Sequence, residues 1–108
     1  MADFNLFWDT LVKEIGSLAK AQLPELWKNA KEDGKAFLDK NKTRLEDWTK
    51  QLANGELSKA DFGFLVKGLK DLTEMEALKQ AGLALIQVDR FKSAVIDTII
   101  GTAFKILL

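Results

Sequence analysis

The sequence of 108 residues contains no cysteine, no histidine and no tyrosine, and it has a single proline. Without histidine or cysteine, the chain offers no conventional transition-metal site and no Ser–His or Cys–His nucleophile pair. The absence of cysteine also excludes a disulfide framework and is compatible with a reducing compartment. We therefore expect a protein that is not an enzyme and that carries no metal and no cofactor.

An excess of charge of either sign is also missing. Sixteen basic and sixteen acidic side chains cancel, and each half of the chain is balanced separately. Nucleic-acid binding normally needs a basic excess on some element, because neutralisation of phosphates drives the affinity. The first residues, MADFNLFWDT, lack the positive charge and the apolar core of a secretion signal. The sequence therefore predicts no nucleic-acid partner and a cytoplasmic location.

Apolar residues recur at three- and four-residue spacing along most of the chain, and no stretch alternates with period two. This pattern predicts α-helices and no sheet. The length and the apolar fraction of 47% predict a single domain, residues 1–108. The expected fold class is all-α, an elongated bundle of three to five helices. The expected helices span residues 4–22, 25–53, 59–72, 74–87 and 90–107, and the last two form either separate helices or one continuous helix.

The first half of the chain carries an eleven-residue repeat. Eleven residues make about three helical turns, so residues at this spacing lie on one slowly turning face. Pro24 either kinks or breaks this helix, and the apolar phase, unchanged across it, favours a kinked, collinear pair. The face is apolar except at Gly34 and Asn41. The series are Phe4, Ile15, Leu26, Phe37 and Trp48; Trp8, Ala19, Ala30, Asn41 and Leu52; and Val12, Leu23, Gly34 and Leu45.

This period is similar to that of the exchangeable apolipoproteins and synucleins, whose helices lie flat on lipid. The resemblance covers residues 4–53 and concerns the period alone. It implies an amphipathic-helix protein that binds lipid or a membrane surface. A long helix packed on a straight partner has the same period, and lysine and arginine do not dominate the edges of the apolar face. Packing is therefore the favoured interpretation, and lipid binding is the alternative.

Local signals predict where the later helices begin and end. Asn54-Gly55 predicts a helix C-terminus, and Ser58 with Asp61 predicts a capping box at the start of the next helix. Thr73 with Glu76 predicts a second capping box. The apolar stripe moves to the opposite side of the helix after Thr73, which predicts a chain reversal or a sharp bend near residues 72–73.

The C-terminal stretch SAVIDTIIGTAFKILL, residues 93–108, carries only two charges. As a helix, residues 90–107 spread apolar side chains over about 220° of the surface, whereas a surface helix needs only about 100°. The short length and the central Asp97 make it a poor membrane span. We expect this helix to touch more than one neighbour, from the same chain or from another. Any break before it is expected near Val88, with Asp89 as the cap.

A helix of about 30 residues reaches about 45 Å, which is longer than a compact domain of this size. We therefore expect a structural or interaction protein that self-associates through its C-terminal helix, most simply as a dimer, or that docks a partner helix. The tryptophans are too far apart to form one pocket and are expected to be core anchors or interface hot spots. The expected interface residues are Phe91, Val95, Ile96, Ile99, Ile100, Ala103, Phe104, Ile106, Leu107, Trp8, Trp27 and Trp48.

The remaining polar and glycine motifs are interpreted as structural. The acidic pairs Glu32-Asp33 and Glu46-Asp47 are expected on a solvated helix face, because adjacent side chains diverge by about 100° and lysines surround them. The Gly63-x4-Gly68 spacing lacks the Lys-Ser/Thr of a phosphate-binding loop. The glycines within the helical pattern are expected to permit close approach of helices. They are Gly16, Gly63, Gly68, Gly82 and Gly101.

Overall fold

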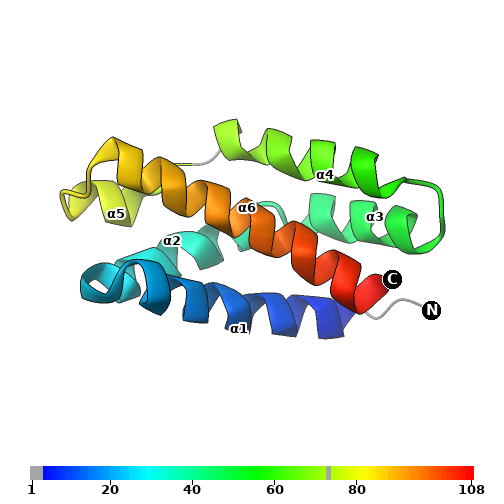
Figure 1. The fold of residues 1–108 in the computed structure, drawn as a ribbon, viewed down its shortest axis with the longest axis horizontal. Helices are drawn as coiled ribbons and strands as arrows, with labels where there is room; N and C mark the ends of the chain where they lie inside the picture. The colour runs from blue at the N-terminus through cyan, green and yellow to red at the C-terminus, as the bar shows by residue number, and fades with distance from the viewer. Residues whose placement is uncertain (1–3, 73) are drawn as a thin grey trace.

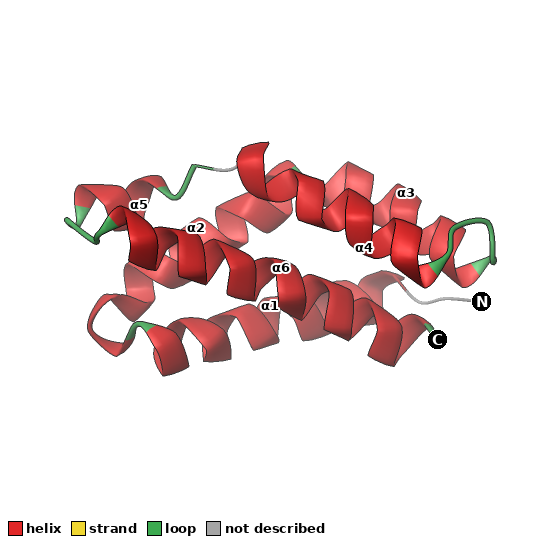
Figure 2. Ribbon diagram, turned by 45° about the horizontal axis from the view of Figure 1, so that its top comes forward, coloured by secondary structure: helices red, strands yellow, loops and turns green. Residues whose placement is uncertain are grey.

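A computed structural model of the chain describes residues 4–72 and 74–108. Every regular element in these residues is a helix, so the predicted all-α fold is confirmed (Figure 1 and Figure 2). The described chain extends 42 × 23 × 19 Å along its principal axes. The helices are α1 (Phe4–Gln22), α2 (Trp27–Lys40), α3 (Lys42–Ala53), α4 (Lys59–Gly68), α5 (Glu76–Gln80) and α6 (Leu85–Leu107), with 3-10 turns at Pro24–Leu26 and Leu69–Leu72.

Helix α6 lies in the middle of the bundle. It packs between α1 and α4 and also contacts α3 and α5 (Figure 1). Its buried residues form one hydrophobic core together with buried residues from each of the other α-helices. The wide apolar arc of this helix is therefore covered by several neighbours, as predicted, and these neighbours belong to the same chain.

The chain folds back at Pro24, so the predicted collinear pair of helices is wrong. Helix α1 ends at Gln22, as predicted, and Pro24 opens a 3-10 turn in which the N–H of Leu26 donates to the carbonyl of Leu23 (3.0 Å). Proline is tolerated in a first helical turn, where its missing N–H costs little. Helix α2 then runs back along α1 (Figure 1). The long N-terminal arm, which was one reason to expect an oligomer, is therefore absent.

Gly34, one exception in the apolar repeat, lies at a close approach of α1 and α2. A Cβ atom on Gly34 would lie only 2.5 Å from Cγ2 of Ile15. That methyl group is attached to the branched Cβ of a buried residue, so it cannot easily move aside. The close approach expected at Gly16, Gly68 and Gly101 is not seen, since no described atom lies within 4 Å of a Cβ atom built there.

Asn41, the other exception in the repeat, interrupts the helix predicted over residues 25–53. Helix α2 ends just before it and α3 begins just after it. Asn41 is buried, and its Nδ2 donates to the carbonyl of Phe37 (2.9 Å). Its Oδ1 accepts a hydrogen bond from the guanidinium of Arg44 (3.1 Å). The polar side chain on the apolar face is thus satisfied at the point where the helix breaks.

The helix ends predicted at Gly55 and Ser58 are confirmed. Gly55 has a left-handed backbone (φ 77°) directly after α3, a conformation that glycine adopts without strain. The hydroxyl of Ser58 accepts a hydrogen bond from the N–H of Asp61 (3.0 Å) at the start of α4. The second predicted capping box begins at Thr73, which lies outside the described residues.

The N-terminus of α5 is capped by Asp33, which belongs to α2. Its Oδ1 accepts from the N–H of Ala77 (3.0 Å), and its Oδ2 accepts from the N–H of Leu78 (2.8 Å). A carboxylate at this place satisfies free N–H groups and meets the positive end of the helix dipole. Asp33 is only 6% exposed, so the interpretation of Glu32-Asp33 as a solvated pair is wrong for Asp33, although Glu32 does face solvent.

Helix α5 ends early, although the sequence predicted a helix over residues 74–87. Gly82 has a left-handed backbone (φ 87°). The N–H groups of Gly82 and Leu83 donate to the carbonyls of Lys79 (3.0 Å) and Leu78 (3.1 Å), which is the Schellman pattern of helix ends. Gly82 therefore ends a helix. The expectation that it permits the close approach of two helices is wrong.

Helix α6 begins at Leu85, so the start expected near residue 90 is wrong. Asp89, the expected cap, lies inside the helix and forms an ion pair with Lys70 (3.1 Å). The helical run from α4 ends at Leu72, as predicted, but the chain turns back along the bundle only after α5 (Figure 1). Two separate helices, α5 and α6, therefore replace the single long C-terminal helix that was one of the expectations.

The eleven-residue repeat lines the core. None of its residues is exposed, because α1, α2 and α3 all turn this face inward. Packing within the chain therefore accounts for the period. The fully buried members are Ile15, Ala19, Ala30, Gly34, Phe37, Asn41, Leu45 and Leu52, and the half-buried members are Phe4, Trp8, Val12, Leu23, Leu26 and Trp48.

Replacing Asp33 with alanine should lower the free energy of unfolding by about 1–2 kcal/mol, because two N–H groups of α5 lose their acceptor. Asp33→Asn retains one acceptor and should lose less. Asp39→Ala, at an exposed position of the same helix, is the matched control and should change stability by less than about 0.5 kcal/mol. Urea unfolding followed by circular dichroism measures these differences. Equal effects at positions 33 and 39 would contradict the capping role.

Gly34→Ala should lower the free energy of unfolding by about 1–3 kcal/mol, because the new methyl group overlaps Ile15. Gly16→Ala in α1, where the space is open, should instead raise it by about 0.5–1 kcal/mol. Adding Ile15→Leu, which removes the methyl branch at Cβ, should recover part of the loss in Gly34→Ala. Calorimetric unfolding of the original chain, Gly34→Ala, Gly16→Ala and Gly34→Ala/Ile15→Leu measures these differences. A Gly34→Ala variant that is more stable than the original chain would show that α1 and α2 do not approach so closely.

Candidate interaction surface

The C-terminal helix buries most of its predicted interface within its own chain. Phe91, Val95, Ile96, Ile99 and Ala103 are fully buried in the core. A narrower stripe of α6 remains accessible, and part of it lines a groove on the surface. The half-buried predicted residues are Ile100 and Phe104, which line this groove, and Ile106 and Leu107, which do not.

The three tryptophans lie in different parts of the molecule and form no common pocket. Trp8 and Trp48 pack half-buried against the core, and Trp27 follows the turn between α1 and α2. The ammonium of Lys42 lies 5.0 Å from the ring centroid of Trp8, and that of Lys20 lies 4.7 Å from the centroid of Trp27. Such cation–π contacts contribute about 0.5–1 kcal/mol at exposed sites. None of the three rings lines the groove.

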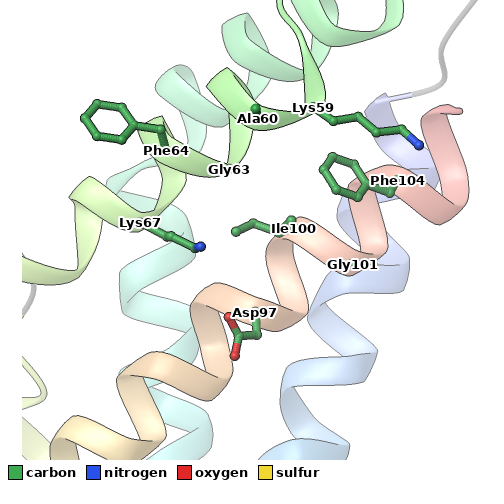
Figure 3. Close-up of a pocket in the computed structure, with 9 residues that line it drawn as sticks. All are labelled: Lys59, Ala60, Gly63, Phe64, Lys67, Asp97, Ile100, Gly101 and Phe104. Atoms are coloured by element: carbon green, nitrogen blue, oxygen red, sulfur yellow. The ribbon is translucent and has the colours of Figure 1, made fainter.

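The groove runs along the outer surface between α4 and α6 and has a volume of about 590 Å³ (Figure 3). One wall comes from α4 and the other from α6. Much of the lining is apolar or has no side chain, which suits the apolar side of a partner. The lining residues are Lys59, Ala60, Gly63, Phe64 and Lys67 from α4, and Asp97, Ile100, Gly101 and Phe104 from α6.

Gly101 leaves open space on the α6 wall, whereas Gly63 on the α4 wall faces the side chain of Ile100. The nearest side-chain atom is 3.9 Å from the Cβ position of Gly63, and nothing described lies within 4 Å of that of Gly101. At one end of the groove, Phe104 packs on the buried ring of Phe62, with centroids 6.0 Å apart. The ammonium of Lys59 lies 5.5 Å from the Phe104 centroid. Phe104 and Lys59 therefore line one end of the groove, and Gly101 leaves open space on the α6 wall.

Phe64 is the most exposed large apolar side chain in the described part of the chain, at 78%. Its ring stands on the side of α4 that faces away from α6 (Figure 3). Burying such a ring would contribute about 1.5–3 kcal/mol, which the folded chain alone does not gain. Sequence reasoning missed Phe64 because it lies outside the apolar stripe of α4 that contains Phe62 and Val66. A large apolar residue on the polar side of a helix was the available signal.

Lys67 and Asp97 lie on opposite walls of the groove, and both are exposed. They also line a smaller hollow that continues the groove along α6. Within residues 4–72 and 74–108, neither of them takes part in an ion pair. The groove therefore presents one positive and one negative side chain, neither in an ion pair, at the same position along its length.

A second exposed apolar surface lies at the start of α6, at the end of the bundle where α5 and α6 meet (Figure 1). Leu85 and Ile86 are 73% and 63% exposed. Residues 80–88 contain no charged side chain.

The described ionisable residues provide no group of three side chains that could hold a metal ion. A hydrogen bond from Lys79 lowers the pKa of Glu74, and the same contact raises the pKa of Lys79. The side chain of Lys79 is 33% exposed and that of Glu74 is 65% exposed, so solvent screening leaves this pair little net effect on stability. No helix of the described chain is long and apolar enough to cross a membrane.

Comparison of the chain with models of protein families, with curated proteins and with solved structures finds no match in any of the three. The groove combines an open apolar floor, an exposed aromatic ring and unpaired charges. These features make it the best candidate for a functional surface.

Positions 62 and 64 provide a matched test of which aromatic rings the fold needs. Phe62→Ala removes a fully buried ring and should lower the free energy of unfolding by about 3–5 kcal/mol. Phe64→Ala should change it by less than about 0.5 kcal/mol, because the ring is already in water. Chemical unfolding followed by tryptophan fluorescence measures both. A large loss in Phe64→Ala would show that the ring stabilises the fold and is not available to a partner.

Proposed function

We propose that the chain is a non-enzymatic interaction protein that docks the apolar face of a helix in the groove between α4 and α6. The helix belongs either to another protein or to a second copy of the chain. The observation that carries the proposal is the exposed ring of Phe64 beside an open groove lined by glycines.

A docked helix would bury surfaces that the folded chain leaves in water. Its side chains would contact Ile100 and Phe104 on one wall and Phe64 on the other. Each large apolar side chain that becomes fully buried contributes about 1.5–3 kcal/mol. Helices that bind in grooves use anchors at positions i, i+3, i+4 and i+7. Gly101 leaves space for such an anchor on the α6 wall.

The charges in the groove favour binding over catalysis. General acid–base chemistry needs groups positioned within hydrogen-bond reach of one another or of a substrate. Lys67 and Asp97 lie across the groove without forming an ion pair. Charges at the rim of an interface set the orientation and the association rate of a partner more than its affinity. A cytoplasmic location remains our prediction from the sequence.

Binding to a lipid surface is the second candidate function. The exposed side chains of Leu85 and Ile86, in a segment without charge, favour it. Apolar side chains at the tip of a protein can insert into the boundary between lipid headgroups and acyl chains. The apolar faces of the eleven-residue repeat are occupied by the core, so lipid binding through them would require the bundle to open.

NMR titration of the isotope-labelled chain with a synthetic amphipathic helix of about 14 residues tests the groove. The probe has a stripe of leucine and alanine and carries glutamate and lysine elsewhere. Amide shifts are expected at Gly63, Phe64 and Gly101. Gly101→Leu fills the groove and should weaken binding by about tenfold or more. Gly68→Leu adds the same side chain outside the groove and should leave binding unchanged.

Unaltered binding by the Gly101→Leu variant would sink the docking proposal. Vesicles of neutral phosphatidylcholine are the comparison probe in the same experiment. Changes confined to Leu85, Ile86 and their neighbours with vesicles, and none with the helix, would favour the lipid function instead.

A further inference from the structure

We infer that the helical surface that fills the groove belongs to a second copy of this chain, related to the first by a two-fold axis that runs along the groove. The inference rests on the proposed docking function and names its partner. It also rests on the charge and the shape of the two walls. After the rotation, the α4 wall of one copy faces the α6 wall of the second copy, and the two are complementary.

The two walls are antiparallel, and their residues correspond in level along the groove. Cδ1 of Ile100 lies 3.9 Å from the Cβ position of Gly63. About one helical turn further along, Lys67 and Asp97 line the same hollow. Gly63 therefore lies opposite Ile100, and Lys67 lies at about the same level as Asp97 (Figure 3).

A two-fold rotation about an axis along the groove leaves the position of each residue along that axis unchanged. It places each wall of the second copy opposite the other wall of the first copy. Helix α4 of one copy then lies over α6 of the other, at the same level. Lys67 meets Asp97 of the second copy, and the contact occurs twice. Both residues lack an ion pair in the described chain. A groove made for a purely acidic or purely basic partner would not carry both signs.

The shapes of the walls fit the same rotation. Phe64 and Gly101 both line the groove, from opposite walls, and they lie on opposite sides of Ile100 in Figure 3. Within one chain these two positions diverge. The rotation brings them to the same flank, so the ring of Phe64 packs against Gly101 of the second copy. Nothing described lies within 4 Å of the Cβ position of Gly101, which leaves room for the ring.

The rotation overlays α4 and α6 of the two copies and leaves α1 outside the contact. A standard interface buries roughly 800 Å² on each partner, and smaller interfaces are typical of weak, transient pairs. The small apolar centre and charged surroundings of the groove are typical of interfaces whose partners also exist separately. We therefore expect a reversible dimer and not an obligate one.

Sedimentation velocity of the full chain over a concentration series measures the dimer. Lys67→Glu alone or Asp97→Lys alone should weaken association by about tenfold or more, because each places like charges together twice. The double variant Lys67→Glu/Asp97→Lys restores the pairs and should associate within about threefold of the original chain. Phe64→Ala should weaken association by about tenfold. Lys40→Glu, at an exposed position of α2, is the control and should have no effect.

Single cysteine variants test the symmetry, because the chain has no cysteine of its own. The rotation places position 64 of one copy beside position 101 of the other. Position 64 of one copy and position 64 of the other lie on opposite sides of the axis, and the same holds for position 101. A mixture of Phe64→Cys and Gly101→Cys chains should therefore form disulfide-linked dimers faster than either variant alone. Equal or faster linkage of either variant with itself would overturn this axis.

A chain that stays monomeric at about 1 mM overturns the inference. A dimer that forms equally well in Phe64→Ala, or one that the double charge exchange does not restore, overturns it as well. Binding of the synthetic helix at Gly101 by a monomeric chain would leave the docking function standing. The failure of this inference is therefore distinguishable from the failure of the proposed function.

Discussion

The carboxylate of Asp33 is the contact on which the arrangement of the C-terminal half depends. A helix of five residues is not stable alone, because its first hydrogen-bonded turn orders several residues for one hydrogen bond. Asp33 accepts from two free N–H groups of α5 and so holds this helix against α2. The position of α5 determines where the turn at Gly82 lies and where α6 enters the core. Gly34, the next residue, lets α1 pack on the same helix, so two adjacent residues of α2 join it to both neighbours.

Periodicity and local signals were sufficient to predict the helical fold, the C-terminal end of α1 and the helix boundaries at Gly55 and Ser58. The end of α5 was also readable in principle, because Gly82 is followed by an apolar residue, as in many glycine-terminated helices. The role of Asp33 was not predictable, because it accepts from backbone N–H groups 44 and 45 residues away. No local sequence pattern distinguishes Asp33 from Glu32. Pro24 was ambiguous for a different reason. Proline in a kink and proline in a first helical turn can have the same neighbours in sequence.

The candidate site was predictable only in part, because a groove belongs to two helices and a sequence describes one helix at a time. The wide apolar arc of α6 required several neighbours but did not identify them. Ile100 and Phe104 were expected at an interface, and they do line the groove. Phe64 became significant only when α4 was found beside α6, where its exposed ring borders the same surface. The two exceptions in the apolar repeat, Gly34 and Asn41, were visible in the sequence and mark a close helix contact and a helix break.

The central position of α6 has a consequence for how the chain is made. This helix follows the others in sequence, yet it contacts α1, and the hydroxyl of Thr102 donates to the carboxylate of Glu14 (2.6 Å) across 88 residues. Contacts between such distant residues slow folding, and apolar surface left uncovered in the meantime promotes aggregation. On the ribosome, α1 to α5 emerge before the helix around which they pack. The apolar faces of α1 to α5 must therefore avoid non-native contacts until α6 is released.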